Sequence, residues 1–281
     1  MAVALGLMVA LSFGSADFLG SRASQRASTL SVLVVGQLVA VFGAFAVAGV
    51  VGARVKPSDV GWGAAAGVVN VAGLGFLYQG LARARIGVVA PITAVMGALV
   101  PVGWALASGE RPSGVVLLGA GCAMVAGGLI ARERDEHDSD RPLASGVGYA
   151  LAAGTLLGTS LVFYAETSAA SGLWPVAVAR LCGLITVGVF LGLVAARQPV
   201  ALPSGGARRL AVGAGVLDVT AATVLLVAVR HGLLVVVAPV AALAPAFTVV
   251  WAWIALRESV SRTQLVGLAL ALIGLVLVAA G

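Results

Sequence analysis

Long apolar runs separated by short polar segments dominate the chain. They lie at about residues 2–20, 30–53, 60–82, 86–108, 113–131, 145–164, 173–196, 208–230, 233–256 and 262–280. Each run is close to the roughly 20 residues that a helix needs to cross a bilayer core, is about twice as long as a barrel strand, and lacks a period of two. The pattern predicts an all-α integral membrane protein with ten transmembrane helices.

A strongly charged segment divides these runs into two groups of five. We predict a first five-helix repeat at residues 1–131, a charged linker at 132–144 that contains the sequence RERDEHDSDR, and a second five-helix repeat at 145–281.

The two halves also match each other in sequence. A shift of 148 residues places Gly67 on Gly215 and the run Val88–Pro91 on Val236–Pro239, without a gap. Because five is an odd number of helices, the second repeat must enter the membrane from the opposite side. The fold class that we predict is therefore two inverted five-helix repeats, related by a pseudo-twofold axis in the membrane plane.

The composition agrees with a bilayer as the main solvent. Hydrophobic residues make up 60% of the chain, charged residues 10%, and the mean hydropathy is +1.10. The net charge of +6 does not indicate nucleic acid, because the cations stand singly or in pairs at the ends of apolar runs. Cys122 and Cys182 lie within apolar runs, so we expect no disulfide. The distribution of cations between the loops favours external termini.

Several local motifs accompany the repeat. Phe13-Gly14-Ser15 lies near the end of the first run, the fourth and ninth runs begin VVAPITAVMGALVPV and VVAPVAALAPAFTVV, and these two runs end in Gly109–Ser113 (GERPS) and Arg257–Ser261 (RESVS). With these motifs the whole chain resembles the EamA-type ten-helix transporters of the drug/metabolite transporter superfamily. Phe13 and Arg257 depart from that family's usual Trp and Gly.

The resemblance implies a function and a location. Such proteins move metabolites, amino acids or toxic compounds across the bacterial inner membrane, often outward, and are drawn with cytoplasmic termini. That orientation is opposite to the one that the loop charges favour, so the side of the termini stays open.

Three ionisable residues fall inside apolar runs, where each charge is costly. Asp218 lies near the middle of the eighth run, and its repeat partner is Asn70, so both are expected near the midplane, where transporters place their sites. Asp218 could exchange a proton with the solvent, or it could form a structural ion pair with Arg180. Arg180 could instead hold a substrate carboxylate or phosphate. Asp17 could face the mouth of the cavity or the headgroup water.

Prolines within the fourth and ninth runs predict broken helices beside a substrate cavity, although kinks that serve packing are the alternative. They are Pro91 and its repeat partner Pro239, with Pro101 and Pro245 deeper in the same runs.

Other polar and aromatic residues could line the pathway, although tyrosine and tryptophan are also common interface anchors. The candidates are Gln37, Tyr78 and Trp251, followed by Gln79, Thr93, Tyr164, Thr220 and Trp253.

Two further residue classes have simpler interpretations. The glycines Gly63, Gly67, Gly119, Gly121, Gly127 and Gly128 are predicted to let helices approach closely. Glu110 and Glu258 stand beside arginines at helix ends, where solvated ion pairs are expected.

The function that we predict from the sequence is secondary active transport, by alternating access, of small metabolites or drug-like solutes, with proton coupling as a hypothesis. An intramembrane aspartyl protease is an alternative because of Asp17 and Asp218, but the Gly-x-Gly-Asp pattern is incomplete at both. A lipid flippase and a membrane sensor also stay open.

His137 and His231 lack metal-ligand spacing and no P-loop occurs, so we expect no enzyme activity, cofactor or metal. The expected partners are a small-molecule substrate and the lipid bilayer, not nucleic acid, with a homodimer left open.

Overall fold

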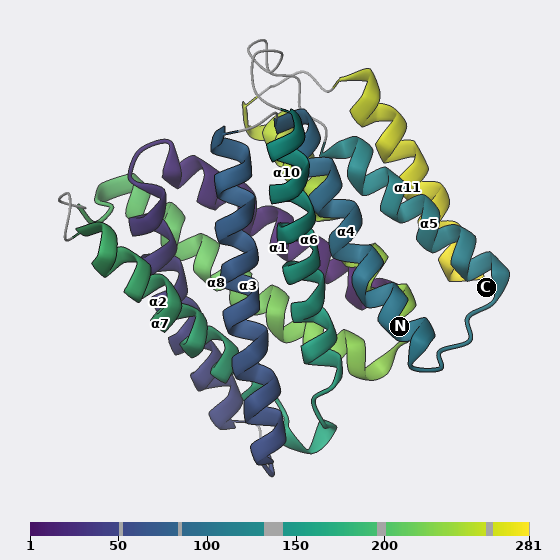
Figure 1. The fold of residues 1–281 in the computed structure, drawn as a ribbon, viewed down its shortest axis with the longest axis horizontal. Coiled ribbons are helices and arrows are strands. Elements are labelled where there is room, and N and C mark those ends of the chain that lie inside the picture. The colour runs from purple at the N-terminus through teal and green to yellow at the C-terminus, as the bar shows by residue number, and fades with distance from the viewer. Residues whose placement is uncertain (51–52, 84–85, 132–142, 196–200, 257–260, 281) are drawn as a thin grey trace.

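The fold is a bundle of α-helices, seen in a computed structural model (Figure 1). The structure describes residues 1–50, 53–83, 86–131, 143–195, 201–256 and 261–280, and within these ranges there are no strands. Most of the predicted linker, as well as Arg257 and Glu258, lies outside the described residues.

The helices follow the ten predicted runs closely. The first repeat contains α1 (Ala2–Ser24), α2 (Thr29–Val50), α3 (Pro57–Arg83), α4 (Ile86–Ala107) and α5 (Gly114–Ile130). The second contains α6 (Leu143–Ala165), the short turn η2 (Ala169–Ser171), α7 (Trp174–Ala195), α8 (Gly205–His231), α9 (Leu234–Ala241), α10 (Ala244–Leu256) and α11 (Arg262–Ala280).

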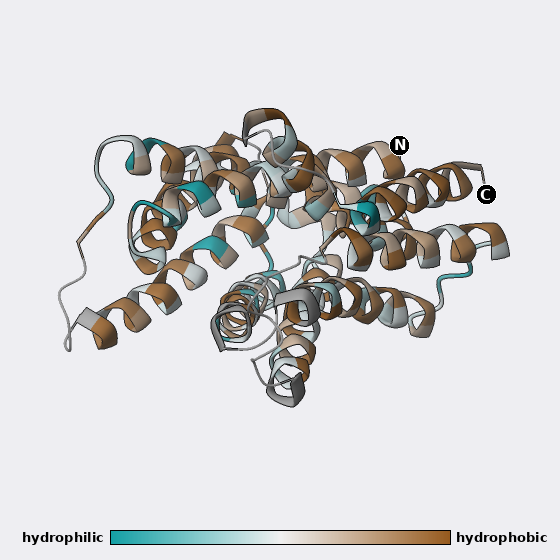
Figure 2. Cartoon of the chain, turned by 90° about the horizontal axis from the view of Figure 1, so that it is seen from above, coloured by the Kyte–Doolittle hydropathy of each residue, from teal (hydrophilic) through white to brown (hydrophobic). Residues whose placement is uncertain are grey.

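The lengths and hydropathy of these helices agree with a multi-pass membrane protein. Within the described ranges, nine segments are long and apolar enough to cross a membrane, with α9 and α10 counted as one, and α5 is a shorter apolar helix of 17 residues. Most of the helical ribbon carries the colours of hydrophobic residues in Figure 2. Helix α1 begins and helix α11 ends at the same end of the bundle, as an even number of spans requires (Figure 1).

The contacts between α5 and α11 show that the repeats are inverted. A Cβ on Gly119 of α5 would lie 2.8 Å from Val278 of α11, and a Cβ on Gly267 of α11 would lie 2.8 Å from Ile130 of α5. In the repeat, Gly119 corresponds to Gly267 and Ile130 to Val278, so exchanging the helices reproduces the contact. The helices are antiparallel, and the pseudo-twofold axis is perpendicular to them.

The other helix pairs obey the same symmetry. Helix α1 packs along α8 as α6 packs along α3, and α2 contacts α8 as α7 contacts α3. Helices α2 and α7 meet each other directly, as do α4 and α9. The centre of the bundle therefore lies between the two repeats.

Helix breaks were predicted at matching positions of both repeats, but the structure has a break in the second repeat alone. Helix α4 continues through both Pro91 and Pro101, whereas α9 ends at Ala241, soon after Pro239, and α10 begins just before Pro245. Proline at position 245 has no N–H to donate to the carbonyl four residues earlier. The repeat partner of Pro245 is Gly97, which keeps its donor. The prediction of a break in the fourth span was therefore wrong.

Glycines bring neighbouring helices into backbone contact, as predicted for Gly63 and Gly67. A Cβ on Gly63 would lie 2.7 Å from the carbonyl oxygen of Pro175, and one on Gly67 would overlap the carbonyl of Ala179. Gly215, the repeat partner of Gly67, lies equally close to α2. Gly119, Gly127 and Gly128 also pack closely, but nothing approaches Gly121 within 4 Å, so that prediction was wrong.

The substitution Gly67→Ala tests the close contact of α3 with α7. The new methyl group would overlap the Ala179 carbonyl and push the helices apart, so we expect a loss of about 1–3 kcal/mol in stability. The measurement is the midpoint of thermal unfolding in detergent. Gly75→Ala, on the same helix with nothing within 4 Å, is the matched control and should unfold no earlier than the wild type. Equal midpoints for the two variants would contradict the packing role.

Candidate functional site

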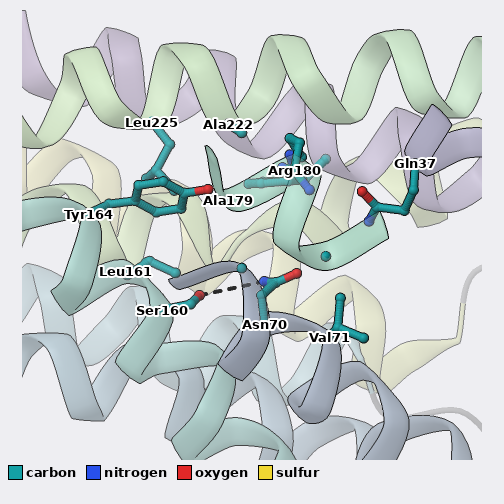
Figure 3. A pocket seen from close by; sticks show the side chains of 13 residues that line it. Gln37, Asn70, Val71, Ser160, Leu161, Tyr164, Ala179, Arg180, Ala222 and Leu225 are labelled. Carbon is teal, nitrogen blue, oxygen red and sulfur yellow. Dashed lines mark hydrogen bonds between the residues drawn. The ribbon is translucent and has the colours of Figure 1, made fainter. Parts of the chain in front are cut away.

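A small polar cavity lies at the centre of the bundle, between the two repeats (Figure 3). Its volume is about 30 Å³, which is enough for two or three water molecules at roughly 10–15 Å³ each. Its polar lining residues are Gln37, Asn70, Ser160, Tyr164 and Arg180, and its other lining residues are Phe13, Gly67, Val71, Leu161, Ala179, Gly183, Ala222 and Leu225. A larger solute can enter only if the helices move apart.

Both repeats supply polar groups to this cavity. Gln37 comes from α2 and Asn70 from α3, whereas Ser160 and Tyr164 lie one turn apart on α6 and Arg180 lies on α7. Asn70 is at the middle of α3, a 27-residue helix. Its amide donates to the hydroxyl of Ser160 at 3.5 Å, as the dashed line in Figure 3 shows. The cavity is therefore near mid-depth in the bundle.

An ion pair joins α7 to α8 beside the cavity. The Nη1 atom of Arg180 lies 2.8 Å from Oδ2 of Asp218, and Nη2 lies 3.4 Å from the backbone oxygen of Asp218. Only 7% of Arg180 is exposed, and an uncompensated charge at that burial would cost several kcal/mol. Of the roles predicted for Arg180, the neutralisation of Asp218 is the one that this geometry supports.

Two buried polar atoms on the cavity wall lack partners. Neither Oε1 of Gln37 nor Nε of Arg180 has a hydrogen bond within the described part of the chain. Buried polar atoms rarely stay unpaired, so both are free to contact a bound molecule.

Asp17 does not line the cavity, although it was predicted in the pathway. Its side chain is exposed on α1, within electrostatic range of Asp218. Because Asp218 is paired with Arg180, the two aspartates do not form the proton-sharing pair of an aspartyl protease.

The structure brings together some predicted residues and not others. Gln37, Asn70 and Arg180 line the cavity, and Asp218 forms an ion pair with Arg180 at its edge. Trp251 is not among the lining residues and instead donates to the hydroxyl of Ser15 at 2.7 Å. The side chain of Tyr78 lies outside the described residues.

The Phe13-Gly14-Ser15 motif has a structural role that its sequence did not reveal. Gly14 lies directly against the backbone of α10, and Thr248 of α10 donates to the carbonyl of Gly14 at 3.0 Å. This contact fixes α1 so that Phe13 reaches the cavity. Sequence reasoning missed Phe13, Ser160 and Gly183 as lining residues, because single apolar or small residues carry no signal in an apolar helix.

Glu110 joins the two repeats at one end of the bundle. Its carboxylate accepts hydrogen bonds from the backbone N–H groups of Leu234, at 2.8 Å, and Val235, at 3.1 Å. It thereby caps the N-terminus of α9, where N–H groups lack intrahelical partners. The solvated pair expected with Arg111 is absent within the described residues, since that side chain donates to the carbonyls of Leu106 and Glu110.

A second network at the same end joins α3 and α8 to the loop between α6 and α7. Asp59, which is 3% exposed, accepts from the Ser168 N–H at 3.0 Å and from the hydroxyls of Ser168 and Ser171. Arg230 donates to the carbonyl of Ser168 at 2.9 Å and to the hydroxyl of Thr167 at 3.1 Å. Together with the hydrogen bonds of Glu110, those of Asp59 link the two repeats at this end of the bundle.

Comparison with known proteins agrees with this architecture. One solved crystal structure matches 98% of this chain and 95% of its own with a TM-score of 0.79 at 16% sequence identity, which shows a shared fold. No curated protein matches the chain. The EamA-like transporter family matches residues 1–132 and 144–280, the two repeats found above. The chain belongs to the EamA-like transporter family.

Proposed function

We propose that this protein is a secondary active transporter that exports small metabolites or drug-like solutes across the bacterial inner membrane by alternating access. The observation that carries the proposal is the polar cavity between two inverted repeats, near mid-depth. Hydrogen bonds link the repeats at one end of the bundle, which we take to be the closed end. Outward transport and the bacterial inner membrane follow from the family resemblance alone.

The symmetry of the bundle supports alternating access. Halves related by a twofold axis in the membrane plane can rock against each other and expose a central site to either side in turn. The cavity volume of about 30 Å³ requires such a movement before a metabolite can bind. The hydrogen bonds of Glu110 and Asp59 must break when the closed end opens.

We also propose that transport is coupled to protons through Asp218. The side chain of Asp218 is 28% accessible, and within the described structure it interacts electrostatically with Arg180, Asp17 and Tyr164. Protonation of Asp218 would release Arg180 from the ion pair and thereby change the charge at the cavity wall.

A double variant tests the coupling. Asp218→Asn alone would leave Arg180 uncompensated and destabilise the fold, so Asp218→Asn is combined with Arg180→Gln, which removes both charges. In liposomes, a pH step should drive solute flux by the wild type, whereas the double variant should exchange solute more slowly, because Arg180 lines the cavity, and any remaining flux should not respond to pH. Asp17→Asn is the control and should keep that response. A pH-driven flux in the double variant would show that Asp218 is not the proton carrier.

Glu110→Gln tests the closed end. A neutral amide can accept from only one of the two N–H groups and lacks the charge that favours a helix N-terminus, so closure should weaken by about 1 kcal/mol. In a background without Cys122 and Cys182, a cysteine introduced by Ser160→Cys should react about fivefold faster with a membrane-impermeant maleimide.

The matched control for Glu110→Gln is the neighbouring Arg111→Gln. Its hydrogen bonds stay within the first repeat, to the carbonyls of Leu106 at the end of α4 and of Glu110, so the labelling rate should not change. If both variants label at the wild-type rate, Glu110 does not hold this end shut.

A further inference from the structure

The two unpartnered atoms on the cavity wall indicate what the cavity binds. Oε1 of Gln37 is a buried acceptor and Nε of Arg180 a buried donor, and both side chains face the same space in Figure 3. We propose that the cavity binds an uncharged solute with an adjacent hydrogen-bond acceptor and donor, such as a carboxamide, attached to an apolar group. The inference rests on the proposed transport function, because it names the solute class of the same cavity.

The charge of the cavity argues for an uncharged solute. Arg180 is the one charged residue among the described lining residues, and the carboxylate of Asp218 already neutralises it through Nη1, while Nη2 donates to the Asp218 backbone oxygen. An anion at the free Nε–H would add a second negative charge to an already neutralised guanidinium, and a cation would lie beside that guanidinium. Burial of a charge without a compensating partner is unfavourable, so the intact ion pair selects against both.

The polar groups of the cavity fit an amide. The carbonyl oxygen of a carboxamide can accept from Nε–H of Arg180, and its N–H can donate to Oε1 of Gln37. Asn70, Ser160 and Tyr164, the other polar lining groups, are uncharged hydrogen-bonding side chains. A bound amide would therefore satisfy the two unpartnered atoms without disturbing the ion pair.

The remaining wall is apolar and suits the hydrocarbon part of the solute. Phe13, Leu161 and Leu225 supply this surface from α1, α6 and α8. When the helices move apart to enlarge the cavity, this surface would otherwise become exposed to water. An apolar group on the solute can cover it, so the preferred solute combines an amide head with an apolar body.

Three molecules of nearly the same shape test the proposal. Benzamide is uncharged, benzoate is an anion and benzamidinium is a cation, and each carries the same ring. In detergent, the wild-type protein should bind benzamide with an affinity in about the millimolar range, as expected for nine heavy atoms. At a benzamide concentration about ten times its dissociation constant, the Tm should rise by about 3 °C. The same concentration of either ion should leave the Tm unchanged.

Variants of Gln37 connect the binding to this cavity. Gln37→Leu removes the acceptor and should weaken benzamide binding about tenfold. Gln37→Glu gives the cavity a net negative charge and should reverse the preference, so that benzamidinium stabilises and benzamide does not. Thr223→Val is the matched control, because Thr223 bonds its own helix through Val219 and is not a lining residue, and its benzamide response should equal the wild type's.

The outcomes separate this inference from the proposed function. The inference is overturned if benzamide does not stabilise the wild type, if benzoate or benzamidinium stabilises it instead, or if Gln37→Leu responds as the wild type does. If any of these results is found but the protein still moves solute in liposomes, the inference is wrong and the proposed transport function is not affected. Benzamide binding by a protein that moves no solute would support the inference and contradict transport.

Discussion

The backbone contact between α3 and α7 determines the geometry of the centre of the molecule. Gly67 and Ala179 touch, and this closeness brings Asn70, one turn further along α3, and Arg180, the next residue of α7, to the same cavity. In a bilayer no hydrophobic force draws apolar helices together, so such packing is a main source of cohesion between them. The polar site therefore depends on a glycine that carries no chemistry itself.

The two repeats are symmetric in packing and asymmetric in chemistry. Asn70 and Asp218 occupy the midpoints of corresponding 27-residue helices, yet one forms a hydrogen bond with Ser160 and the other an ion pair with Arg180. Symmetric packing allows both halves to move in related ways. Asymmetric side chains let one half hold the charge while the other supplies uncharged contacts.

The sequence allowed the helices, the repeat and its inversion to be predicted, because hydrophobic run length and residue register are local or periodic signals. Gln37, Asn70 and Arg180 were predicted as pathway residues, since polar residues are conspicuous within apolar runs, and the structure places all three on the wall of one cavity. It could not decide between the roles of Arg180, because its partner depends on how α7 and α8 pack.

Contacts between residues far apart in the chain account for the errors. Glu110 was expected to pair with its neighbour, but its partners Leu234 and Val235 are 124 and 125 residues away. The break in the ninth span arises from Pro245, whose counterpart Gly97 leaves the fourth span continuous. The small and apolar residues on the cavity wall, such as Gly183 and Phe13, resemble every other such residue in a membrane helix.

The burial of α9 has a consequence for how the protein is made. All eight residues of this short helix are buried, and α1, α4, α5 and α8 surround it. The ribosome completes all five helices of the first repeat, and α6, α7 and α8 as well, before α9 emerges, so the surfaces that contact α9 must wait for a segment synthesised late. The first repeat therefore cannot complete its packing alone, and a chain truncated before residue 234 should be recognised by the cell's quality control as unassembled.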